Sequence, residues 1–110
     1  MAFWEEVDDL CAQMAHVVDR PAGSAHPRFP DWRYPVDYGY LAGTVGGGGE
    51  GIDVWFGSAE EGGVTALLCS IDPHKRDSEV TYLWRCTQDE VAAVRRFYEG
   101  QPMKVLFVER

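Results

Sequence analysis

A chain of 110 residues has the length of one domain and can bury roughly two-thirds of its unfolded surface. Its formal net charge is −8, because Asp and Glu outnumber Lys and Arg by 18 to 10. No segment provides the basic stripe that nucleic-acid binding requires, and no apolar run is long enough to span a bilayer. We therefore expect one domain over residues 1–110 that binds neither nucleic acid nor a membrane.

The three cysteines indicate the redox environment. Cys11, Cys69 and Cys86 are odd in number and lack C-x-x-C spacing, so we expect small buried hydrophobic residues, without disulfides or zinc. The first residues, MAFWEE, lack the basic start and the long apolar stretch of a signal peptide. Together these features favour a cytoplasmic location.

The first half of the chain contains one helical pattern followed by irregular segments. Residues 3–15 place apolar side chains at intervals of three and four, which is typical of an amphipathic helix. After a short apolar piece at 17–18, Pro and Gly within 19–24 predict a turn. Residues 26–34 are rich in Pro and aromatic residues, which predicts an ordered but irregular segment, and residues 43–51 form a glycine-rich loop.

The second half is dominated by β patterns. A capping box, with Thr87 at the N-cap and Glu90 three residues later, predicts a helix that ends near Gly100. The predicted strands are 52–56, 64–71, 79–84 and 103–108. The pattern indicates a mainly-β domain with flanking helices (α+β), built as a small barrel or a twisted sheet.

Four carboxylates follow the glycine-rich loop in two groups. Glu50 and Asp53 lie three residues apart where the loop meets a predicted strand. Asp72 and Asp77 lie five apart, and Pro73 between them argues against a continuous strand, so the two can converge across a loop. Converging carboxylates suit Mg²⁺, which prefers oxygen ligands. Solvated loop acids and turn formers are the alternative explanation for the same residues.

One long segment resembles a known enzyme family. Residues 34–44, YPVDYGYLAGT, resemble the Y-P-x-N/D-Y-G-Y/F-x-x-x-T segment of soluble family I inorganic pyrophosphatases. Residues 48–54, GGEGIDV, fall at the spacing of that family's D-G-D-P-x-D-V signature, and Asp72 and Asp77 fit its next metal aspartates. Residues 19–27, DRPAGSAHP, look like the lead-in of a short, compact branch of this family.

The resemblance implies an OB-like β-barrel with the active site at its mouth. It also implies hydrolysis of inorganic pyrophosphate with Mg²⁺, or with Mn²⁺ as the alternative metal. By position, Glu50 would bind metal and orient the attacking water, Tyr38 would give a catalytic hydrogen bond and Tyr34 would frame the site. The metal ligands implied are Glu50, Asp53, Asp72 and Asp77.

Phosphate contacts would have to come from basic residues near these segments. Arginine suits bidentate contacts with phosphate, although the same residues could instead pair with surface acids. The candidates for phosphate binding are Arg28, Arg33, Lys75 and Arg76, together with Tyr34.

The sequence also departs from the family pattern. Gly48 stands where the signature has its first aspartate, and Glu79 stands where the family carries a phosphate-binding lysine. These changes predict weakened activity, and they leave open a non-catalytic pyrophosphatase-like binding module or a hydrolase of another phosphoanhydride. A homo-oligomer is a further alternative if the aromatic residues around Trp32, Trp55 and Trp84 are exposed, while burial would explain them equally well.

Overall fold

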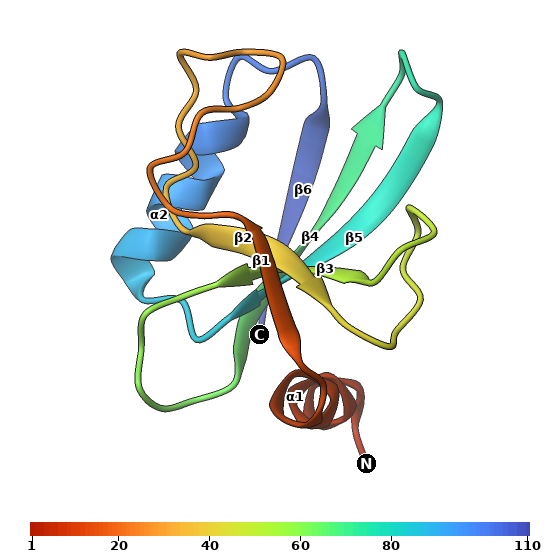
Figure 1. The fold of residues 1–110 in the computed structure, drawn as a ribbon. Coiled ribbons are helices and arrows are strands. Elements are labelled where there is room, and N and C mark those ends of the chain that lie inside the picture. The colour runs from red at the N-terminus through yellow and green to blue at the C-terminus, as the bar shows by residue number, and fades with distance from the viewer.

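A computed structural model describes all residues 1–110, which form a six-stranded sheet with one helix against each face (Figure 1). The mainly-β, α+β class predicted from the sequence is confirmed. No helix is both long and apolar enough to span a membrane. In chain order the elements are α1 (Phe3–Gln13), β1 (His16–Arg20), β2 (Asp37–Leu41), β3 (Ile52–Phe56), β4 (Val64–Asp72), β5 (Asp77–Trp84), α2 (Gln88–Tyr98) and β6 (Lys104–Glu109).

The strands lie in the order β1-β2-β3-β5-β4-β6. Neighbouring strands are antiparallel except β3 and β5, which run parallel and pair Asp53 with Thr81 and Trp55 with Leu83. β1 and β6 are the two edges of the sheet and are not hydrogen-bonded to one another. A six-stranded sheet is therefore established, while the finer prediction of an OB-like barrel of the pyrophosphatase type stays a prediction.

The face of the sheet toward α1 carries one hydrophobic cluster. Val7 and Cys11 of α1 are buried against Val54 and Phe56 of β3. The other buried members of this cluster are Leu41, Val64 and Trp84. Burial raises the pKa of the Cys11 thiol to about 12, so this cysteine behaves as a small hydrophobic residue, as its spacing predicts.

The opposite face packs against α2. Trp55, the neighbour of Val54 and Phe56 on β3, points to this side because successive strand residues alternate between faces. Trp55 is fully buried and Trp84 nearly so, which excludes both as an exposed self-association surface. The buried members of this second cluster are Tyr34, Val36, Trp55, Leu68, Leu83, Cys86 and Val94.

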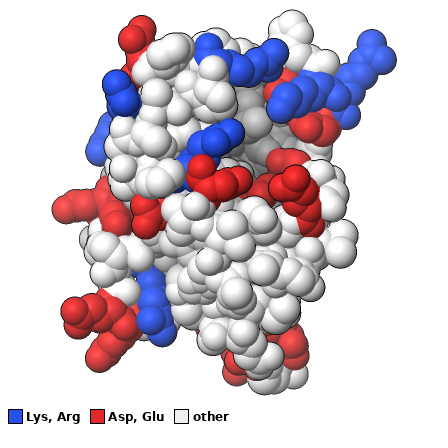
Figure 2. Space-filling model, in the orientation of Figure 1, with Lys and Arg blue, Asp and Glu red and all other residues white.

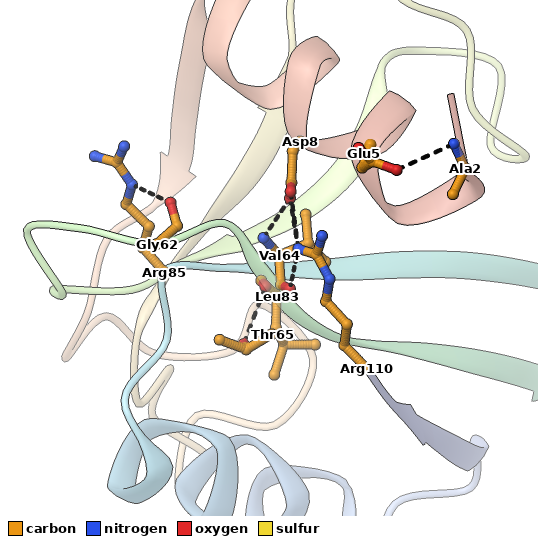
Figure 3. Close-up of polar contacts among 9 residues, drawn as sticks. All are labelled: Ala2, Glu5, Asp8, Gly62, Val64, Thr65, Leu83, Arg85 and Arg110. Atoms are coloured by element: carbon orange, nitrogen blue, oxygen red, sulfur yellow. Dashed lines mark hydrogen bonds and ion pairs between the residues drawn. The ribbon is translucent and has the colours of Figure 1, made fainter.

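Asp8 joins three distant parts of the chain (Figure 3). Its carboxylate accepts the backbone N–H of Val64 at the start of β4, at 2.7 Å. It also forms an ion pair with Arg110, whose Nη1 lies 2.8 Å from one carboxylate oxygen and 3.1 Å from the other. Because both partners are partly shielded from water, this contact fixes α1 against the sheet more firmly than an exposed ion pair would.

The predicted capping box of α2 is confirmed. The Thr87 side chain accepts the backbone N–H of Glu90, and the Glu90 carboxylate accepts the backbone N–H of Thr87. The helix ends at Tyr98, and Gly100 follows with φ +79°, a left-handed conformation that glycine adopts without strain. α2 thereby places Phe97 and Tyr98 over the sheet face that carries Trp55.

The sequence patterns missed β1, of which only the apolar piece at 17–18 was noted, and β2, whose residues DYGYL include a central glycine. A glycine inside a strand weakens a strand prediction and often marks a close backbone approach. That is its role here, because a Cβ at Gly39 would overlap the Val17 carbonyl oxygen of β1.

This contact predicts that Gly39→Ala lowers the free energy of unfolding by about 3 kcal/mol or more, because backbone atoms would have to separate. Gly47→Ala is the matched control: its Cβ would meet Glu79 and Ser78 at ordinary distances of 3.5 Å, and we expect a change within about 1 kcal/mol. Urea denaturation of both variants measures the difference. Equal stability of the two variants would contradict the close approach of β1 and β2.

Candidate functional site

Four carboxylates gather at one end of the parallel β3–β5 pair, and we call them the acidic cluster: Asp19, Glu50, Asp53 and Glu79. Asp53 lies opposite Thr81, so Glu79 comes two residues earlier on the same face of the sheet. Asp53 and Glu79 are half-buried, whereas Asp19 and Glu50 are exposed. Burial raises the pKa of Asp53 to about 6, and the negative charges of Glu79, Asp19 and Glu50 add to the shift.

Tyr38 lies beside this cluster. Its hydroxyl can donate to the Asp53 carboxylate, and this contact partly offsets the rise in the Asp53 pKa. Burial is the main cause of a raised pKa at Tyr38 itself, and the charge of Asp53 raises it further. The phenol therefore stays protonated, so it can serve as a hydrogen-bond donor at the site.

Glu79 occupies the space beside Gly48. A Cβ built on Gly48 would lie 2.5 Å from Oε1 of Glu79. Gly48, where the resemblance would place an aspartate, is therefore next to the carboxylate of Glu79 on β5. In the sequence Gly48 and Glu79 are two separate departures from the pyrophosphatase pattern. The pairing of β3 with β5 brings the two residues together.

A small cavity of about 100 Å³ lies behind the acidic cluster, and we call it the aromatic cavity. Its aromatic lining consists of His26, Tyr34, Tyr38, Trp55, Phe97 and Tyr98, and its polar lining includes Ser70, Glu79, Thr81 and Gln101. The Trp55 ring centroid lies 4.7 Å from that of Tyr38 and 5.4 Å from that of Phe97.

The Trp55 side chain, which borders this cavity, carries an unsatisfied polar group. Its indole Nε1 is buried without a hydrogen-bond partner. The Tyr98 hydroxyl is near enough for the indole to lower its pKa, against the larger effect of burial, but the two are not in hydrogen-bonding geometry. A buried N–H without an acceptor is unfavourable, and the hydroxyl of Tyr98 is its nearest polar neighbour of those described.

A larger cavity of about 670 Å³, which we call the basic cavity, adjoins the aromatic one. His26, Gln101 and Met103 line both cavities. The basic lining of the larger one is His26, Arg28, His74 and Lys75. Burial and then the charges of Arg20, Arg28 and Lys75 lower the pKa of His26, so positive charge is concentrated there. Figure 2 shows basic side chains across the upper part of this face and acidic ones across its middle.

Asp72 and Asp77 form the last residue pair of the β4–β5 hairpin, so their backbones lie side by side, while their joint role as metal ligands stays a prediction. The turn itself uses Asp72, whose Oδ1 accepts the backbone N–H groups of His74 at 2.9 Å and Lys75 at 3.2 Å. Asp72 lines the basic cavity, whereas the groups that raise the Asp53 pKa do not include either hairpin aspartate. The four predicted metal ligands therefore lie in two separate pairs.

The residues predicted to contact phosphate also lie at separate places in the structure. Arg28 and Lys75 share the basic cavity. Arg33 lines a different pocket beside Arg96, and its Nη1 donates to the Gly23 carbonyl oxygen at 3.3 Å. Arg76 sits in the hairpin turn with φ +56°, while Tyr34 is a buried core residue that also borders the aromatic cavity.

The acidic cluster has the donor chemistry that magnesium requires. Protein sites for Mg²⁺ commonly use one or two carboxylates, and substrate phosphates and waters complete the octahedron. The two ion pairs of the chain are Arg95–Glu109 and Arg110–Asp8, so no member of the acidic cluster takes part in an ion pair. No group of three or more His, Cys, Asp or Glu is placed to hold a metal ion without such additional ligands.

Comparisons of the chain with protein-family models, curated proteins and solved structures find no match. Fold class alone does not determine function, because one architecture can carry many different sites. The chemistry of this mouth therefore has to be derived from its own side chains: an acidic cluster, an aromatic cavity and a basic cavity that meet at His26 and Glu79.

The raised pKa of Asp53 predicts a specific pH dependence of stability. The unfolded carboxyl ionises near 3.8 and the folded one near 6, so the folded state binds more protons between these values. Stability must then fall as the pH rises from about 4 to 6, and it stays lower above that. A shift of about two units corresponds to about 3 kcal/mol, and partial exposure to solvent reduces this to about 1–2 kcal/mol.

Asp53→Asn should remove this fall, which is measured by urea denaturation at pH 4 and pH 7. Asp9→Asn, on the exposed side of α1, is the control and should follow the wild type. If the free energy of unfolding changed equally between pH 4 and pH 7 in wild type and in Asp53→Asn, the raised pKa of Asp53 would be contradicted.

Proposed function

We propose that this mouth hydrolyses inorganic pyrophosphate, or a related phosphoanhydride, with the help of Mg²⁺. The observation that carries this proposal is the junction of an uncompensated acidic cluster with a basic cavity. A phosphate ligand needs positive charge, which Arg28 and Lys75 can provide, and a divalent cation needs carboxylates. A metal–phosphate complex requires both charges side by side.

Each residue then has a defined task. Asp53 and Glu50 would hold Mg²⁺, with Mn²⁺ as the alternative, and the ion when bound would neutralise charge that develops on the phosphates. Arg28 and Lys75 would orient the phosphate groups from the opposite side. Tyr38 would hold the Asp53 carboxylate in place through its hydroxyl. Hydrolysis forms a bond from the water oxygen to phosphorus and breaks the bond from that phosphorus to the bridging oxygen.

Two further observations support this proposal. The Glu79 carboxylate lies beside Gly48, so the negative charge missing from the signature position is supplied from a neighbouring strand. In addition, β5 lies between β3 and β4, and such a non-sequential order is compatible with the partly open Greek-key barrel of an OB-like fold. The resemblance of residues 34–54 to pyrophosphatases and the geometry of the mouth thus favour the same chemistry.

A non-catalytic binding module is the second candidate, and the position of Asp72 favours it. The Asp72 carboxylate accepts two backbone N–H groups within its own turn and lies apart from Asp53. A site whose carboxylates are divided in this way could bind a phosphorylated ligand without hydrolysing it.

Release of phosphate from pyrophosphate, with excess Mg²⁺ and then Mn²⁺, tests the proposed function. We expect turnover that Asp53→Asn lowers at least 100-fold, because a single misplaced or missing carboxylate at such a site has a large effect on rate. Arg28→Gln should raise KM, and Asp9→Asn should match the wild type. Absence of turnover with either metal, in protein that binds phosphate, would favour the binding module.

The contact between Gly48 and Glu79 predicts how an added signature aspartate behaves. Gly48→Asp alone should not raise turnover, because the new side chain meets the Glu79 carboxylate and repels it. The double variant Gly48→Asp/Glu79→Gln removes the repulsion and should exceed Gly48→Asp in both turnover and thermal stability. An increase of activity from Gly48→Asp alone would mean that Glu79 does not compensate for the missing residue.

A further inference from the structure

The sheet face toward α1 carries an apolar surface on its three strands β5, β4 and β6. Tyr82 packs against the cluster on the α1 side, whereas its neighbour Leu83 belongs to the cluster on the α2 side, so alternate residues share a face. The strand registers set the residues of the α1 side in three rows, which we call the apolar grid: Tyr82–Leu67–Val108, Val80–Cys69–Leu106 and Ser78–Ile71–Lys104.

α1 covers only one end of the apolar grid. The ring centroid of Phe3 lies 6.4 Å from that of Tyr82 in the first row. Asp8, further along the helix, accepts the backbone N–H of Val64 at the start of β4. The helix therefore lies at the end of the first row, and the other two rows extend away from it toward the turn between β4 and β5 (Figure 1).

The uncovered part of the grid exposes large apolar side chains. Leu106 is 66% exposed and Ile71 is 58% exposed. Val80 and Val108 are exposed beside them, and Phe3 is exposed at the edge of the helix. Single exposed apolar residues are common on protein surfaces, whereas neighbours that form one patch across three strands mark an interaction surface.

The distribution of charge around the grid is uneven. The chain has a net charge of −8, yet the grid contains no carboxylate and its one charged residue is Lys104. At one end of the grid α1 carries four acidic residues and no basic one. At the other end lie Lys104 and the hairpin turn, in which Lys75 and Arg76 outnumber the exposed Asp77. The surface therefore has an acidic end and a basic end.

We propose that a second copy of this chain covers the apolar grid, face to face, around a two-fold axis that reverses the strand direction. α1 stands on the sheet at one end of the grid, so a partner with the same strand direction would bring helix against helix. The reversed partner instead places each α1 beyond the hairpin end of the other sheet. It also sets the acidic end of one chain against the basic end of the other, which offsets the repulsion between two acidic chains.

The size of the surface indicates a reversible dimer. Three strands about 4.8 Å apart, each with three residues about 6.8 Å apart on one face, cover about 300 Å² of each chain. A specific interface buries about 1,000 Å² or more, counted over both chains. The grid must therefore be joined by side chains of α1 and of the hairpin turn, so association should depend on the apolar contact and on the charged ends together.

Analytical ultracentrifugation of the full chain over about a hundredfold range of concentration tests the proposal. The wild type should pass from monomer to dimer within this range. Leu106→Glu should weaken the association about tenfold or more, because it buries a carboxylate in an apolar contact. Leu106 is largely exposed in the single chain, so this variant should stay folded by circular dichroism. Val45→Glu, at an 83% exposed position in the glycine-rich loop, is the control and should associate like the wild type.

Charge reversal tests the orientation of the partner. Lys104→Glu should weaken the dimer about fivefold, because it would face the acidic helix of the other chain. Glu6 lies one turn from Phe3 on the exposed side of α1, and Glu6→Lys added to Lys104→Glu should restore association. A chain that stays monomeric throughout, or a dimer that Leu106→Glu leaves unchanged, would overturn the proposal and leave another protein as the occupant of the grid. A dimer that Lys104→Glu does not weaken would overturn the reversed orientation.

Discussion

The parallel pairing of β3 with β5 is the constraint on which the rest of the molecule depends. It is the one parallel contact in the sheet, and it sets Asp53 opposite Thr81 and Trp55 opposite Leu83. Glu79 is thereby brought to Asp53, although the two residues are 26 positions apart in the sequence. The same register gives each helix its own face, because Val54 and Phe56 point to α1 while Trp55 points to α2. The acidic cluster and the aromatic cavity are both consequences of this single alignment of strands.

The alignment has a cost that the rest of the fold must offset. The half-buried carboxylate of Asp53 lies near the negative charge of Glu79 and takes part in no ion pair, and its raised pKa means that its ionised form opposes folding at neutral pH. The two apolar clusters, the capping box of α2 and the Asp8–Arg110 contact act in the opposite direction. Uncompensated charge concentrated in one mouth, within an otherwise well-satisfied structure, is characteristic of a binding site rather than of a packing requirement.

Local patterns predicted most elements because their signals lie within a few residues of one another. The apolar spacing of α1, the Thr87–Glu90 capping box and the alternation along β5 are of this kind. β2 was missed because its central Gly39 is explained only by the close approach of Val17 from another strand. The site shows the same limit. Arg28 and Lys75 were expected near phosphate and do share a cavity, whereas the pairing of Gly48 with Glu79 and the separation of Asp72 from Asp53 depend on tertiary register.

The sequence and the structure lead to different interpretations of Glu79. In the sequence its negative charge stands in place of an expected lysine and suggests a lost phosphate contact. In the structure its carboxylate lies next to Gly48, and Glu79 also lines the aromatic cavity. The positive charges of Arg28 and Lys75 line the adjoining basic cavity. A ligand that contacts both Glu79 and the basic cavity would have to present positive charge to one and negative charge to the other, as the proposed metal–phosphate complex does.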